Sequence, residues 1–86
     1  MAAGPAAEEV AGRVVDVRGD PVPDALVTIP EGTAPLPEIA LLVDPDGRFR
    51  LRLPHGRFTL RAHGGGGSGE TEVQIPGESA PLITVQ

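Results

Sequence analysis

The 86-residue sequence contains no Cys, Trp, Tyr, Lys or Asn. Because it has no Cys, the chain forms no disulfide, thiolate metal site or cysteine nucleophile. The absence of Trp and Tyr removes the exposed rings on which sugars and nucleic-acid bases usually stack. Without Lys and Asn, the chain cannot form the Lys–Asn crosslink found in some surface β-sandwiches. A binding function would therefore depend mainly on arginine and carboxylate side chains and on the loops.

The composition favours one small all-β domain. A chain of 86 residues has room for a single hydrophobic core. Gly and Pro contribute 12 and 10 residues, which is typical of short strands joined by tight turns and not of a helical bundle. We expect residues 1–8 to form a flexible arm and residues 9–86 to form the domain. No apolar run has the length of a signal peptide or membrane span, which predicts a cytoplasmic location for a whole gene product, or an extracytoplasmic one for an excised domain.

The formal net charge of −5 conceals an uneven distribution of arginines. Residues 48–63 contain five of the seven arginines and no acidic residue, whereas the rest of the chain has two arginines against all twelve acidic residues. The protein is therefore acidic apart from one basic segment. Charged segments are usually solvated faces, so we weigh such a face against a docking surface for an acidic protein.

Seven segments have the alternation, β-branched content and turn boundaries of strands, at residues 10–17, 25–29, 39–43, 48–53, 57–62, 70–75 and 82–86. Val14 and Val15 fall on opposite sides of the first segment and leave its buried face ambiguous. The number and spacing of the segments predict a seven-stranded antiparallel Greek-key β-sandwich with Phe49 and Phe58 in its core.

The most regular alternation lies in residues 48–53 and 57–62, which are separated by Pro54, His55 and Gly56. This pattern predicts an antiparallel hairpin with one buried and one solvated face. In the register that follows, Arg50 would stand opposite Arg61. Like charges that face each other are unfavourable, so we expect the outward carboxylates of Glu70 and Glu72 on the next strand to neutralise them.

Two Asp- and Gly-containing segments are interpreted as turns. Asp16 and Asp20 flank Gly19, and their carboxylates can accept hydrogen bonds from turn amides. Asp44-Pro45-Asp46-Gly47 also begins like a calcium loop, but arginines follow where further oxygen ligands would be needed. The sequence therefore favours a turn at both places.

The order of these motifs resembles the carboxypeptidase regulatory-like domain. The resemblance covers about residues 9–62 and rests on three successive stretches: Val10-x-Gly12-x-Val14-x-Asp16, Gly19-x-Pro21-Val22-Pro23-Asp24-Ala25-x-Val27, and Asp44-x-Asp46-Gly47-x-Phe49-x-Leu51-x-Leu53-Pro54-x-Gly56-x-Phe58-x-Leu60. It implies a transthyretin-like (prealbumin-like) sandwich and a non-catalytic domain that accompanies another activity. The chain departs from the family where Gly64–Gly69 replaces a more structured turn.

We expect no catalytic, cofactor-binding or metal-binding residues, and no cofactor. His55 and His63 should lie at opposite ends of one strand, too far apart to share a metal or a proton. Ser68 and Ser79 lie in glycine-containing turns without a neighbouring His. A transthyretin-like hydrolase is disfavoured because its C-terminal Tyr-Arg-Gly-Ser motif is missing, and iron-dependent dioxygenases of related fold need tyrosines that this chain lacks.

The remaining hypothesis is a structural or interaction module that docks on a larger protein assembly, such as a contractile injection particle. A carbohydrate-binding or cell-surface accessory module is the alternative, and pairing of two copies through an edge strand stays open. We expect neither nucleic acid nor a membrane as partner. The candidate partner-binding residues are Arg48, Arg50, Arg52, Arg57, Arg61, Leu36 and Ile39. The last two belong to the proline-rich segment 30–39, for which a plain crossover between sheets is the favoured interpretation.

Overall fold

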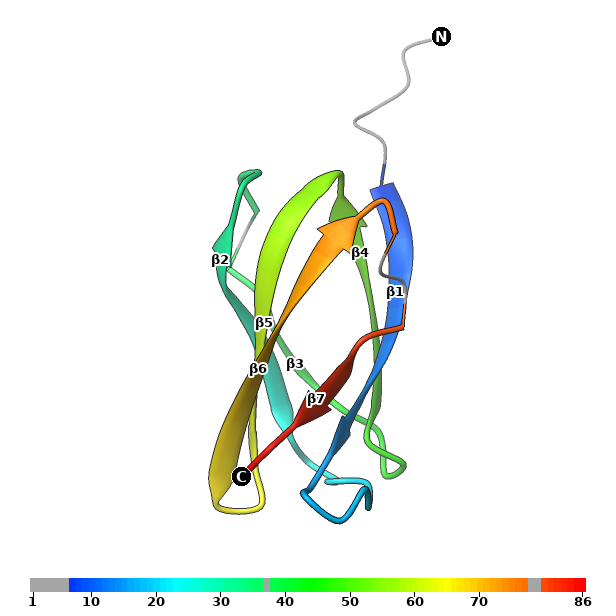
Figure 1. The fold of residues 1–86 in the computed structure, drawn as a ribbon, viewed down its shortest axis with the longest axis vertical. Helices are drawn as coiled ribbons and strands as arrows, with labels where there is room; N and C mark the ends of the chain where they lie inside the picture. Colours follow the sequence, from blue (N-terminus) through cyan, green and yellow to red (C-terminus); the bar gives the residue numbers. More distant parts are fainter. Residues whose placement is uncertain (1–6, 37, 78–79) are drawn as a thin grey trace, which may run out of the picture.

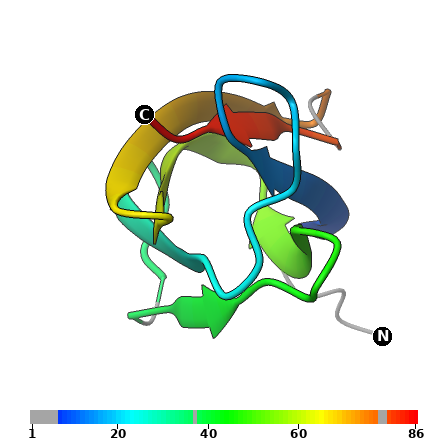
Figure 2. The same ribbon diagram turned by 90° about the horizontal axis from the view of Figure 1, so that it is seen from below.

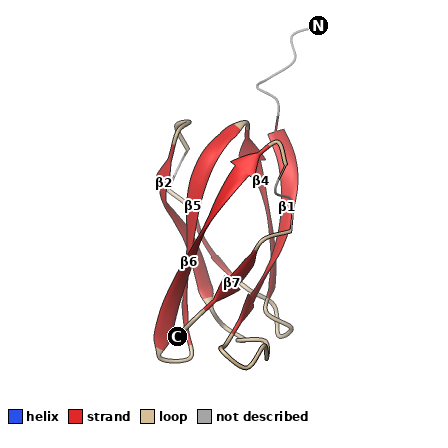
Figure 3. Ribbon diagram, viewed as in Figure 1, coloured by secondary structure: helices blue, strands red, loops and turns tan. Residues whose placement is uncertain are grey.

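The computed structural model describes residues 7–36, 38–77 and 80–86, which form strands and turns without a helix (Figures 1 and 3). The strands are β1 (Ala7–Val15), β2 (Leu26–Gly32), β3 (Ala40–Leu42), β4 (Arg48–Pro54), β5 (Gly56–Gly64), β6 (Gly67–Ile75) and β7 (Leu82–Thr84). The predicted seven-stranded all-β sandwich is therefore confirmed. Residues 1–6 of the predicted arm lie outside the described residues, and Ala7 and Glu8 are part of β1.

The strands form two sheets that enclose one interior, as the view along the molecule shows (Figure 2). Sheet A has three strands in the order β4-β1-β7, and sheet B has four in the order β3-β2-β5-β6. All pairs of neighbouring strands are antiparallel except β1 and β7, which are parallel. The expectation of a purely antiparallel sandwich is corrected at this pair.

The predicted hairpin between residues 48–53 and 57–62 is wrong, because β4 and β5 belong to different sheets. β4 pairs with β1, while β5 pairs with β2 and β6. The link at His55 carries the chain from one layer to the other, and Gly56, the first residue of β5, adopts a φ of 152° that favours glycine. Buried and exposed residues alternate along both strands as predicted. The apolar faces of the two strands, however, face each other across the core instead of lying side by side in one sheet.

The core is built from the inward side chains of both sheets. Its largest fully buried members are Phe58, Leu53, Leu60, Ile83, Val10, Val14, Val27 and Val73. Phe49 is also buried, so both phenylalanines occupy the predicted interior. Each ring lies over a glycine in the neighbouring strand: a Cβ at Gly12 would overlap the Phe49 ring, and one at Gly32 would overlap Phe58.

The structure shows which face of β1 is buried. Val10, Gly12 and Val14 point inward, and Val15 is also buried where the strand ends. The predicted strand at residues 25–29 is too short, because β2 continues through Pro30 to Gly32. The register between β2 and β5 shifts between Thr28 and Glu31, and this bulge accommodates a proline that cannot donate to the ladder.

Two turns of the same design close one end of the sandwich. The carboxylate Oδ1 of Asp16 accepts the amides of Arg18 (2.9 Å) and Asp20 (3.0 Å). Asp44 Oδ1 likewise accepts the amides of Asp46 and Arg48, both at 2.9 Å. The turn interpretation is confirmed for both segments, although Asp20 contributes through its backbone and not through its carboxylate.

Candidate functional site

The outer surface of sheet A carries a cluster of arginines. We define the basic face as six outward side chains of β1 and β4, which are Glu9, Ala11, Arg13, Arg48, Arg50 and Arg52. The antiparallel register places Arg48 opposite Arg13, Arg50 opposite Ala11 and Arg52 opposite Glu9. Alternation along both strands therefore brings four guanidinium groups and one carboxylate onto a three-stranded surface.

Within the part of the chain that the structure describes, no ion pair neutralises the four arginines of the basic face, and Glu9 supplies one carboxylate against four guanidiniums. Neither of the two ion pairs there includes Arg13, Arg48, Arg50 or Arg52. Arg13 Nε and Arg52 Nη2 make only long hydrogen bonds, each of 3.4 Å, to the backbone carbonyls of Asp46 and Ala7. Arg13 and Arg48 face each other directly, an arrangement that costs stability unless an anion lies nearby.

A shallow groove of about 300 Å³ lies beside these arginines, where β1 passes between β4 and β7. Arg13, Arg48 and Arg50 line it together with the apolar residues Ala11 and Leu82. Leu82 is 56% exposed. The face thus combines positive charge with accessible apolar surface.

Arg57 and Arg61, the other two arginines of the basic segment 48–63, lie on sheet B. Arg61 forms an ion pair with Glu70 across the β5–β6 ladder, with a hydrogen bond of 2.6 Å from Nε to Oε2. This confirms the expected neutralisation by Glu70, whereas Glu72 stands opposite Thr59. The five arginines therefore do not form one surface, and Arg50 does not face Arg61.

Arg13 also belongs to the basic face, although no motif in the sequence groups it with residues 48–52. Its outward position follows from the inward Gly12 and Val14, a signal that is present in the sequence. What brings it beside Arg48 is the pairing of β1 with β4, which joins segments far apart in the chain.

The two apolar candidates lie in the long connection between β2 and β3. Leu36 is half-buried and packs against the core, so it helps to close the sandwich. Ile39 is also half-buried and lines a groove of about 400 Å³ with Thr28, Pro30 and Ala40. The favoured interpretation of a crossover between sheets is wrong, because β2 and β3 are antiparallel neighbours in sheet B and this segment joins them within one sheet.

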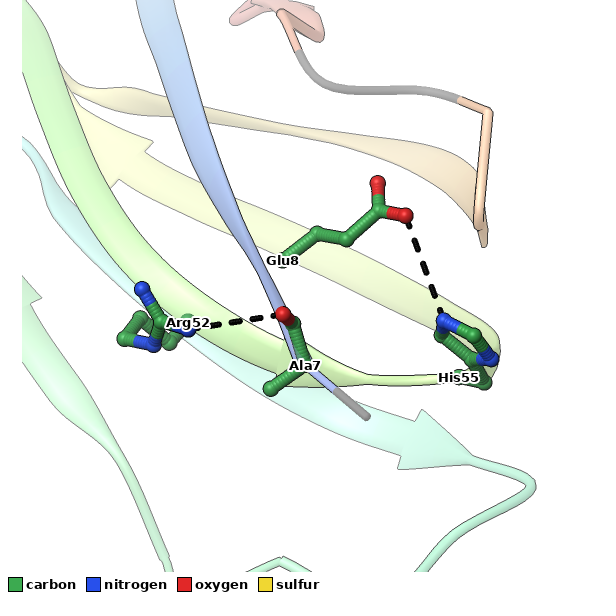
Figure 4. A network of polar contacts seen from close by, with 4 residues as sticks. All are labelled: Ala7, Glu8, Arg52 and His55. Atoms are coloured by element: carbon green, nitrogen blue, oxygen red, sulfur yellow. Dashed lines mark hydrogen bonds and ion pairs between the residues drawn. The ribbon is translucent and has the colours of Figure 1, made fainter. Parts of the chain in front are cut away.

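The two histidines lie apart in the described residues, as expected. His55 and His63 lie just before β5 and near its end. His55 Nε2 is 3.9 Å from Glu8 Oε2, and this exposed pair lies beside the contact between Arg52 and the Ala7 carbonyl (Figure 4).

No group of three or more metal-binding side chains occurs among residues 7–36, 38–77 and 80–86. Of the two serines considered as nucleophiles, Ser79 lies outside the described residues. The described residues contain no helix that is long and apolar enough to cross a membrane.

The chain is similar in fold to a crystallised DUF3823 family protein from Parabacteroides merdae. The TM-score is 0.76 at 18% sequence identity, and the match covers 96% of this chain and 47% of the other. The chain thus spans about half the length of that protein, and the likeness shows the fold alone. No curated protein matches the sequence. The family model of the carboxypeptidase regulatory-like domain matches residues 9–86, beyond the 9–62 stretch that carried the resemblance, and the chain belongs to this family.

Proposed function

We propose that this domain is a non-catalytic docking module whose basic face binds an acidic surface of a protein partner, such as a subunit of a larger assembly. The observation that carries the proposal is the group of four outward guanidiniums on sheet A with no ion-paired carboxylate among the described residues. An acidic partner would supply the missing countercharge and relieve the repulsion between Arg13 and Arg48.

The surroundings of the arginines support an interface. Ala11 and the exposed Leu82 provide apolar area next to the charges, and protein interfaces commonly combine an apolar centre with arginines. Arginine also suits carboxylate binding because its planar guanidinium can bond both oxygens of one carboxylate. Membership of a regulatory-like family is consistent with an accessory role.

Reversal of two charges on this face should abolish binding while the fold survives. We expect Arg50→Glu/Arg52→Glu to weaken capture of the native partner by well over about tenfold, because new carboxylates would repel the acidic surface. Wild-type binding should also weaken as salt rises, since about 1 M salt shortens the screening length to about 3 Å. Affinity can be measured by biolayer interferometry with the partner that co-purifies from the native source.

The matched control is Arg18→Glu/Arg57→Glu, which makes the same change in net charge at exposed positions away from the basic face. It should retain at least about half of the wild-type affinity, with a small loss from long-range repulsion only. Equal losses in both double variants would show that the partner senses total charge, which contradicts docking through sheet A.

A further inference from the structure

β4 is an edge strand with one unpaired side. It contributes seven residues to sheet A and pairs only with β1 among the strands that the structure describes. A strand edge of this kind presents backbone groups that can pair with a further strand. The other edge strands are β3 and β7, each three residues long, and β6, whose start is already bonded to the C-terminal segment through the backbones of Ser68 and Gln86.

The hydrogen bonds near the start of β4 show which of its peptide groups point toward β1. The amide of Val14 donates to the carbonyl of Gly47 at 2.7 Å, just before the strand begins. In an antiparallel pair, every second residue bonds to the partner strand. By this alternation and the register, Phe49 and Leu51 direct their backbone groups toward β1.

The residues that alternate with Phe49 and Leu51 direct their backbone N–H and C=O groups away from β1, to the free side of β4. Arg48 confirms this direction, because its carbonyl accepts the Asp44 amide and its own amide bonds Asp44 Oδ1, both at 2.9 Å. The same alternation turns the N–H and C=O groups of Arg50 and Arg52 to the open edge. Their guanidiniums lie on the basic face at the same time.

The side chains along this edge specify what an added strand should carry. Arg50 and Arg52 are two residues apart, so their side chains leave the outer face about 7 Å apart. Carboxylates at alternate positions of an added strand would stand beside them. The inner face of β4 offers Leu51, which is half-buried and packed against the core, so the position between two carboxylates should be apolar.

We propose that the free edge of β4 is a strand-addition site for an extended acidic segment of the partner, with carboxylates and apolar side chains in alternation. The proposal rests on the docking role of the basic face and adds the binding mode. Backbone hydrogen bonds to Arg50 and Arg52 would supply affinity, and the paired guanidiniums would select an acidic segment over a neutral one.

The test uses a peptide of about nine residues in which Glu alternates with Val, long enough to cover one edge strand. Two N-methylated isomers keep its charge and composition: one is methylated on the Glu amides, the other on the Val amides. Only one set of amides can face β4, so we expect the two isomers to differ in dissociation constant by at least about tenfold. An equal affinity for all three peptides would overturn strand addition and leave docking by charge alone.

A pair of variants of the protein tests the same edge. Arg50→Pro and Arg50→Ala both remove the guanidinium, but only Pro removes the N–H, which edge strands tolerate on their solvent side. Arg50→Pro should bind the peptide at least about tenfold more weakly than Arg50→Ala, with unchanged circular dichroism. Equal binding of the two variants would contradict the proposal.

Two further outcomes would also overturn this assignment. If none of the peptides binds, the edge does not accept an acidic strand, and capture by the Arg50→Glu/Arg52→Glu variant decides the docking role separately. If the wild-type protein alone self-associates in sedimentation experiments and Arg50→Pro prevents it, a second copy of the chain occupies the edge.

Discussion

Phe58→Ala should lower the free energy of unfolding by about 3–5 kcal/mol, the usual cost of truncating a fully buried phenylalanine. The side chain is 1% exposed and is the largest of the fully buried residues. Its ring lies against Gly32, where no side chain can move in to fill the space. A domain of this size has a total stability of about 4–13 kcal/mol, so this single change would consume much of it.

Urea denaturation followed by circular dichroism measures this effect. Phe58→Leu is the first control, because it retains most of the buried volume and should cost clearly less. Leu82→Ala is the second, since Leu82 is 56% exposed and its loss should change stability by no more than about 0.5 kcal/mol. A loss below about 1 kcal/mol for Phe58→Ala would contradict the complete burial of this ring in the core.

Gly69→Ala should destabilise the domain by about 3 kcal/mol, at the upper end of the range for overpacked sites. A Cβ at this position would overlap the carbonyl of Thr84 and lie 3.3 Å from Val85 Cα. These neighbours are backbone atoms of the C-terminal segment and cannot rotate away. The Ser68 and Gln86 backbones also exchange hydrogen bonds of 3.3 and 3.1 Å, which tie the start of β6 to the end of the chain.

Thermal or urea unfolding and hydrogen exchange together test this contact between the two sheets. Faster exchange in Gly69→Ala should concentrate at residues 82–86, because the added methyl group would displace that segment. Ser68→Ala is the matched control: it is the neighbouring position, its side chain is exposed, and its backbone bonds are kept. Wild-type stability in Gly69→Ala would show that β6 and the C-terminal segment are not closely packed.

Local features of the fold could be predicted from the sequence because each depends on residues close together in the chain. The turns at Asp16 and Asp44 need only an Asp side chain within reach of nearby amides, and the structure has both. The burial of Phe49 and Phe58 follows from alternation within one strand.

Strand pairing could not be predicted in the same way. The short link at His55 is compatible with a hairpin and with a passage between sheets, and alternation fixes which face of a strand is buried without naming its neighbour. The pairing of β1 with β4 arises from contacts between distant segments.

The sequence predicted which arginines of the candidate site are exposed, but it did not predict how they are grouped. Arg48, Arg50 and Arg52 are outward and exposed, as their alternation with apolar residues indicated. Their grouping with Arg61 failed because it depended on the hairpin. Arg13 joins them only through the ladder between β1 and β4.

The most direct test of the docking surface is a two-dimensional NMR titration of the ¹⁵N-labelled protein with the alternating Glu and Val peptide. We predict that the largest amide shifts fall on residues 9–13 and 48–54, the two strands that carry the basic face. Residues 56–64 and 67–75, on the other sheet, should change little. Shifts centred on Arg57 and Arg61, or spread evenly over both sheets, would contradict a partner site on sheet A.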